Sequence, residues 1–132
     1  MNGKEIQIQA MYYLSQMDGN NWEDAWHSLA ELGSAALPYI RETYHCAADD
    51  RKRVLLIQVL AELRDAESLD LFNEALHSSS AEVWKKALDA LVSLGGSAAA
   101  ELLCTAEAEM PAERRDWIRE ALHQITQGEL TK

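Results

Sequence analysis

The sequence is poor in the residues that interrupt helices and in the segments that mark membrane or secreted proteins. Its 132 residues include 2 prolines and 6 glycines, whereas Ala, Leu and Glu are abundant, a composition that favours helix. No apolar run approaches the roughly 18 to 20 residues that span a bilayer. The N-terminus lacks a basic region followed by an apolar stretch, so we expect neither a membrane span nor a signal peptide.

Cysteine and positive charge are also scarce. Cys46 and Cys104 form no CxxC pair, and two isolated thiols are typical of the reducing cytoplasm, where we expect this protein to reside. There are 12 basic residues against 22 acidic ones, so the formal net charge is −10. An acidic chain repels phosphate backbones and anionic membrane surfaces, and we therefore expect neither nucleic acid nor a membrane as a direct partner.

A repeat is the most prominent feature that the sequence does contain. The word LAEL occurs twice, and related words, LVSL and LHQI, follow it along the chain. A constant interval of 31 residues separates the last residues of these words, which are Leu32, Leu63, Leu94 and Ile125. A fixed interval of this length is the signature of a repeat architecture.

One repeat reads as two helices joined by a short turn. In the third repeat, Ser79 followed by Glu82 is a capping-box pattern, which predicts that a helix begins near Ser80. Gly95-Gly96 predicts its end, and Ser97 opens the second helix. We expect the leucines of the repeated words to be buried, namely Leu60, Leu63, Leu91 and Leu94.

The other repeats follow the same plan. Asp49 and Asp50 are predicted to cap the first helix of the second repeat, and Arg64-Asp65 to form its turn. Gly33 is predicted to end the first helix of the first repeat, and Gly128 the last helix of the chain. The expected helices are 6–17, 22–32, 35–44, 54–63, 66–77, 80–94, 97–110 and 111–127.

These helices predict an all-α fold, an α-solenoid of stacked antiparallel helix pairs with about eight helices. No linker interrupts the pattern, so we expect a single domain over residues 1–132. Its expected parts are an N-terminal capping helix (1–19), three helix-pair repeats (20–48, 49–78 and 79–110) and a C-terminal capping helix (111–128).

The repeats resemble the short HEAT-like repeats named after phycobilisome lyases. The resemblance covers about Trp22 to Gln127, and the second repeat departs from the pattern by placing Arg64 where a glycine is usual. Tetratricopeptide and ankyrin arrays have longer periods and characteristic words that are missing here. The pattern is clearest in the third repeat, at Val83, Lys85, Ala87, Ala90, Leu91, Leu94 and Gly95.

Signs of catalysis or metal binding are weak. Iron-dependent hydroxylases of this fold carry His-Glu pairs, but none of His27, His45, His77 and His123 is followed by Glu. His45, Cys46 and His77 include soft metal ligands, yet solvated histidines at helix ends are the commoner explanation. No nucleophile motif is recognisable. We therefore predict no catalytic residue, no metal and no cofactor.

The resemblance also predicts where a partner binds. In HEAT-like arrays the second helix of each pair usually lines the concave side, and repeat stacks generally serve as extended binding surfaces. The alternative is an ordinary solvated face. The candidate protein-binding residues on these helices are Tyr39, Glu42, Asp70, Asn73, Glu74, His77 and Glu101.

Tryptophan and arginine share one repeat position. Trp22 and Trp84 lie two intervals apart, with Arg53 and Arg115 at the equivalent positions of the other repeats. Because arginine is seldom buried without a partner, we predict that this column is partly exposed. It serves either as packing, with Arg stacked on Trp, or as an interface stripe; we favour packing.

Two functional hypotheses follow. The first is a non-catalytic binding protein with an acidic surface for a basic protein partner, in its sharper form a bacterial immunity protein that neutralises a basic toxin. The second, which rests on the family name alone, is a lyase-like or chaperone-like HEAT protein that acts on a tetrapyrrole-carrying protein. That role requires an apolar, ligand-sized cleft.

Overall fold

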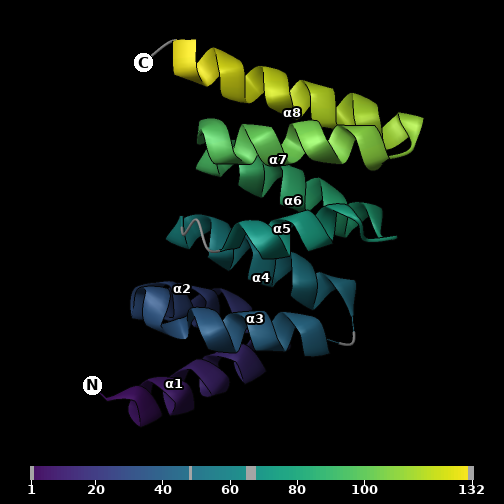
Figure 1. Cartoon of the computed structure of the whole chain (residues 1–132). Coiled ribbons are helices and arrows are strands. Elements are labelled where there is room, and N and C mark those ends of the chain that lie inside the picture. The colour runs from purple at the N-terminus through teal and green to yellow at the C-terminus, as the bar shows by residue number, and fades with distance from the viewer. Residues whose placement is uncertain (1, 48, 65–67, 131–132) are drawn as a thin grey trace. The chain divides into compact units, whose positions relative to one another are not determined.

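The computed structural model describes residues 2–47, 49–64 and 68–130. These residues form eight α-helices and one short 3₁₀ helix and contain no β-strand (Figure 1). The predicted all-α fold is therefore confirmed. The elements are α1 (Gly3–Gln16), α2 (Trp22–Leu32), η1 (Gly33–Ala36), α3 (Leu37–Cys46), α4 (Asp50–Leu63), α5 (Leu69–Leu76), α6 (Ala81–Leu94), α7 (Gly96–Glu109) and α8 (Ala112–Leu130).

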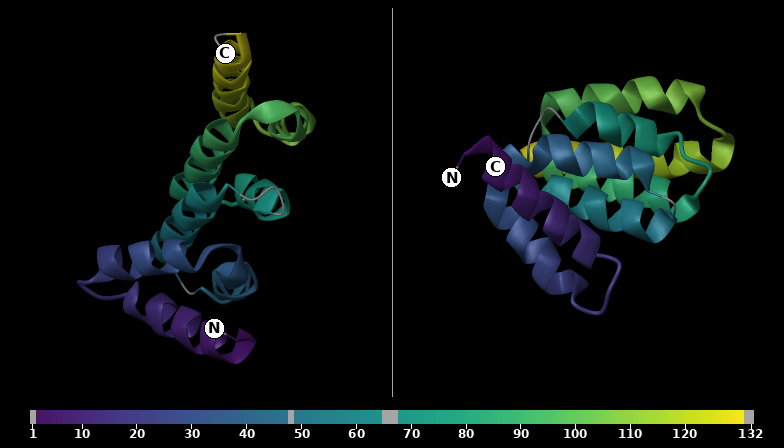
Figure 2. Two further views of the ribbon diagram at one scale, coloured as in Figure 1. Left: turned by 90° about the vertical axis from the view of Figure 1, so that its left-hand side faces the viewer. Right: turned by 90° about the horizontal axis from the view of Figure 1, so that it is seen from below.

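The helices group into two compact units, residues 1–65 and residues 66–132. In the first unit α1 packs on α2 and α3, and α2 packs on α4. In the second unit α6 contacts α8, and α5 contacts α7, so its four helices form two rows (Figure 2, left). Helices one interval apart thus lie side by side within each unit, and α1 packs beside α3, the second helix of the first repeat.

The helix boundaries follow from local chemistry. Asp49 caps α4, because its carboxylate accepts a hydrogen bond from the Lys52 amide at 2.8 Å. Gly33 and Gly95 follow α2 and α6 with positive φ angles of 69° and 65°. Arg64 ends α4 at φ 51°, in the left-handed helical region. These ends are the predicted ones; Asp65 and Ala66, the predicted turn residue and start of the next helix, lie outside the described residues.

Two predictions about helix ends are wrong. Helix α6 begins at Ala81, which confirms the predicted start near Ser80, but the capping box at Ser79 does not form, because Ser80 is the N-cap and lies one residue out of register with Glu82. Helix α8 runs through Gly128 to Leu130. A glycine ends a helix when it adopts a positive φ angle, as Gly33 and Gly95 do, whereas Gly128 lies within α8.

The repeated leucines divide into buried and half-buried positions. Leu29, Leu60 and Leu91 are fully buried, which confirms the prediction for the last two. Leu63 and Leu94 are only half-buried, so their predicted burial is wrong. Each is the last residue of its helix, where the chain turns away from the packed row.

Candidate functional site

The predicted binding residues of the second unit lie on α5 and α7. On α5 and its C-cap residue His77, the side chains of Asp70, Asn73, Glu74 and His77 are exposed, whereas Leu71, Phe72, Ala75 and Leu76 are buried. On α7, Glu101 is exposed and Ala99, Leu103 and Ala106 are buried. Because α5 packs on α7, these side chains belong to one surface, which we call the α5–α7 face.

His77 joins the two helices of this face. Its Nε2 lies 3.1 Å from a carboxylate oxygen of Glu109, and its Nδ1 lies 2.8 Å from the backbone oxygen of Asn73. Since a carbonyl oxygen can only accept, Nδ1 supplies the hydrogen of that bond. The His77 side chain is therefore engaged within the protein. Glu109 was missed from the sequence, although it lies close to one interval beyond His77.

A second acidic residue of α7 is taken up by an ion pair. The Arg119 guanidinium on α8 bonds the carboxylate of Glu107. This hydrogen bond, together with the attraction of the same carboxylate, raises the pKa of the Arg119 guanidinium. Glu107 is thereby paired with Arg119. The exposed carboxylates of the α5–α7 face also include those of Asp70, Glu74 and Glu101.

The other two predicted binding residues belong to the first unit, on α3. The Tyr39 side chain is half-buried, and the Tyr39 carbonyl accepts a hydrogen bond from the Thr43 hydroxyl at 2.8 Å. Glu42 is exposed. Among the described residues no side chain pairs with the Glu42 carboxylate. Tyr39 therefore offers less contact area than the sequence suggested, while Glu42 remains available.

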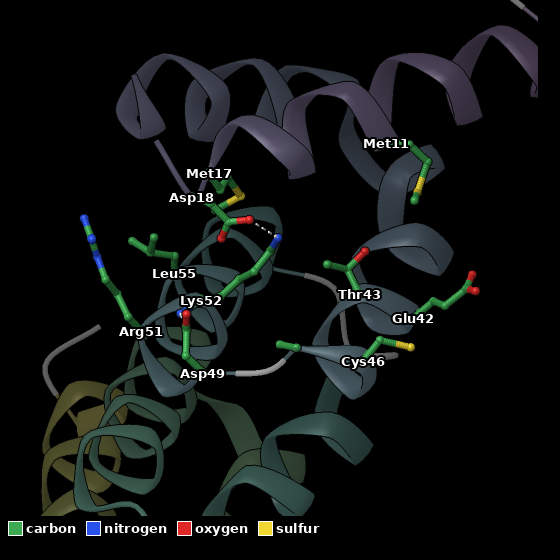
Figure 3. A pocket seen from close by; sticks show the side chains of 11 residues that line it. Met11, Met17, Asp18, Glu42, Thr43, Cys46, Asp49, Arg51, Lys52 and Leu55 are labelled. Carbon is green, nitrogen blue, oxygen red and sulfur yellow. Dashed lines mark hydrogen bonds and ion pairs between the residues drawn. The ribbon is translucent and has the colours of Figure 1, made fainter. Parts of the chain in front are cut away.

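Glu42 stands at the edge of a groove of about 490 Å³ in the first unit. Helix α3 contributes Glu42, Thr43 and Cys46, and Met11 of α1 lies on the same side of the groove (Figure 3). The α1–α2 turn and the start of α4 supply the remaining lining. The lining side chains are Met11, Met17, Asp18, Glu42, Thr43, Cys46, Ala47, Asp49, Arg51, Lys52 and Leu55.

The charged side chains around this groove differ in whether they have a partner within the protein. Lys52 reaches across it to a carboxylate oxygen of Asp18 at 3.0 Å, and Lys52 is the more buried partner, with 16% of its side chain exposed against 60% for Asp18 (Figure 3). Asp49 is held as the cap of α4. Arg51 points away from the other labelled side chains (Figure 3). Glu42 is thus the carboxylate left to meet a ligand.

The tryptophan–arginine column is partly exposed at three of its four positions, as predicted, and buried at the fourth. Trp84 is only 4% exposed, whereas Trp22, Arg53 and Arg115 are half-buried. Trp84 is covered by Arg114, whose guanidinium carbon lies 4.9 Å from the ring centroid and whose Nη1 donates to the Leu76 carbonyl at 2.8 Å. Stacking by arginine is thus observed, but from the residue next to the predicted one.

The chemistry of the remaining candidates is limited. Cys46 and Cys104 are free thiols with exposed side chains. Within the described parts of the chain, no three His, Cys, Asp or Glu side chains converge as metal ligands would. In the same parts, no helix combines the length and apolar character that crossing a bilayer requires.

Comparison with known protein families identifies the family to which this repeat architecture belongs. The family profile described as HEAT repeats matches residues 37–123, more than half of the chain. The chain belongs to the HEAT-repeat family. No curated protein and no solved structure matched it.

As a HEAT-repeat protein, the chain has the α-solenoid fold class that its 31-residue interval predicted. HEAT repeats are generally non-enzymatic scaffolds that mediate protein–protein interaction. The family thus supports a binding role of a general kind.

Proposed function

We propose that this HEAT-repeat protein is a non-catalytic binding protein, and that the α5–α7 face holds a basic protein partner. The observation that carries the proposal is the exposure of Asp70, Glu74 and Glu101 on two helices that pack side by side. The net charge of −10 adds a long-range attraction for a cationic surface. Such complementarity accelerates encounter and selects against acidic partners.

A sharper form of this proposal is a bacterial immunity protein that neutralises a basic toxin such as a nuclease. The small size, the acidic charge and the repeat architecture suit that role, and the two free thiols suit the cytoplasm. The lyase-like or chaperone-like alternative finds less support. The 490 Å³ groove has a suitable size for a ligand, but five of its lining residues are charged.

The test is a charge reversal on the proposed face. Replacing Asp70, Glu74 and Glu101 with lysine leaves the fold intact, because all three side chains are exposed. It should slow association with the basic protein partner by about tenfold at low salt. The effect should be smaller at high salt, where ions screen the electrostatic attraction between the two proteins. Association rates measured at two salt concentrations give the result.

The matched control carries the same charge change on other helices. Glu23, Glu31 and Glu62 on α2 and α4 are also exposed, and their replacement with lysine should slow association less. Equal losses in both variants would mean that only net charge matters. A loss confined to the control variant would place the binding site elsewhere.

A further inference from the structure

Helix α1 carries an exposed apolar stripe. Four large apolar side chains are exposed among the described residues, and three of them are Ile8, Met11 and Tyr12, with exposed fractions of 61%, 47% and 59%. Their spacing of three and four residues places them on one face of the helix. An exposed, contiguous apolar face of this kind marks an interaction surface more often than scattered single residues do.

The stripe lies opposite the face by which α1 is held in its unit. Ala10, Leu14 and Met17 are buried against the neighbouring helices. Helix α1 is therefore apolar on two opposed faces, a pattern typical of a helix packed on both sides. Helix α8 of the second unit differs, since Asp116, Arg119 and Glu120 are exposed on it.

The stripe continues into the groove through Met11, which belongs to both. The groove adds apolar lining from Met17 and Leu55, which are buried, and the Glu42 carboxylate at its edge. A ligand on this surface can therefore contact the exposed side chains of Ile8, Met11 and Tyr12, place one of its own side chains in the groove, and pair with the Glu42 carboxylate.

We propose that the α1 stripe and the adjoining groove dock an amphipathic helix of another protein, which carries a lysine or arginine beside its apolar face. A helix fits because the stripe offers side-chain ridges at helical spacing. An extended segment gains most of its affinity from a sheet edge, and the described residues contain no strand. The partner helix is expected to carry a basic residue because the Glu42 carboxylate at the groove edge is available to pair with it. This docking surface is distinct from the α5–α7 face and does not depend on it.

A second copy of the chain suits the surface less well than a basic helix. Each copy would bring its available Glu42 carboxylate to the same contact, and a net charge of −10 to the encounter. Like charges brought together at an interface oppose association. One helix face is also small beside the roughly 800 Å² per partner of a stable interface.

The test uses a synthetic peptide of about 18 residues made of Leu, Lys and Ala, with its leucines at helical spacing on one face. Fluorescein-labelled peptide is titrated with the full chain and followed by anisotropy. We expect saturable binding that weakens about tenfold or more in the Ile8→Ser, Tyr12→Ser double variant, since the anchoring area is lost. Glu42→Gln should weaken binding about threefold at low salt only.

Two controls make the result specific. Trp117→Ser removes an apolar side chain as exposed as Met11, both at 47%, from α8 of the other unit, and should leave binding unchanged. A peptide of the same composition with its leucines scattered around the helix should bind at least about tenfold more weakly, if the docking is helical. Circular dichroism checks that each variant keeps its helices.

Other outcomes overturn the proposal. Undiminished binding to the Ile8, Tyr12 double variant, or equal binding of both peptides, would show that the stripe is not the docking surface, as would no saturable binding. Analytical ultracentrifugation of the protein without peptide tests whether a second copy of the chain occupies the stripe instead. A dimer that is lost in the same double variant would mean that a second copy covers the stripe.

Discussion

The burial of single leucines decides how sensitive the fold is at each position. Leu91 is fully buried in α6, whereas Leu94, at the end of the same helix, is half-buried. Leu91→Ala should lower the free energy of unfolding by about 2 to 5 kcal/mol, through lost transfer energy and the cavity left behind. Leu94→Ala should cost clearly less. Urea unfolding of both variants checks this, and equal losses would contradict the burial pattern.

Two N-cap residues differ in the bond that they make. The Asp49 carboxylate accepts from the Lys52 amide at 2.8 Å, whereas the Ser80 side chain makes no such bond to α6. Asp49→Ala should therefore cost about 1 kcal/mol of unfolding free energy. Ser80→Ala should change it by less than about 0.5 kcal/mol. Thermal unfolding of the pair measures the difference, and a larger loss at Ser80 would refute the assignment of caps.

At the scale of the helix, the turn that ends α4 differs from those that end α2 and α6. Gly33 and Gly95 combine positive φ with ψ angles of −151° and −168°, a region essentially restricted to glycine. Arg64 adopts φ 51° and ψ 40°, the ordinary left-handed region, which other residues reach at a cost. The second repeat can therefore do without the family's glycine.

This difference predicts opposite effects of substitution at equivalent positions. Arg64→Gly should raise the free energy of unfolding by about 0.5 to 1 kcal/mol, because the strain of the left-handed conformation is relieved. Gly95→Ala should lower it by about 1 to 3 kcal/mol. Both are measured by denaturant unfolding. A destabilised Arg64→Gly variant would mean that the arginine side chain itself contributes more than its backbone strain costs.

Helix positions could be predicted from the sequence because the 31-residue interval recurs in each repeat, so each helix is supported by its equivalents in the other repeats. The ends of α2, α4 and α6 were found from Gly33, Arg64 and Gly95, each of which acts through its own backbone. The capping register at Ser80 and the run of α8 through Gly128 could not be found this way. The sequence pattern fits a helix capped at either Ser79 or Ser80, and a last helix that either stops at Gly128 or continues through it. Tertiary packing decides between these conformations.

At the scale of the whole molecule, the boundary between the two compact units lies between α4 and α5, inside the second predicted repeat. The 31-residue interval and the family match, over residues 37–123, both continue across it. We therefore predict a single domain that unfolds in one cooperative urea transition, with coincident curves from circular dichroism and tyrosine–tryptophan absorbance. Two separated transitions would instead mean that each unit folds on its own.

The binding surfaces were predictable to different degrees. Periodicity alone places Asp70, Glu74 and Glu101 on exposed helix faces. The groove could not be predicted, because it joins Met11, Asp18 and Lys52 through the packing of separate helices and one ion pair. The α1 stripe was visible in principle, since Ile8, Met11 and Tyr12 have helical spacing. Periodicity cannot say which of two apolar faces is covered.

The four tryptophans are divided equally between the halves of the chain, and this gives the protein a built-in optical readout. Trp22 and Trp26 belong to the first unit, and Trp84 and Trp117 to the second. The rings of the second pair lie 5.8 Å apart, and the Lys85 ammonium is 4.5 Å from the centre of the exposed Trp117 ring. Replacing one pair with phenylalanine leaves emission from the other half alone. The wavelength of that emission then reports which half a ligand has touched.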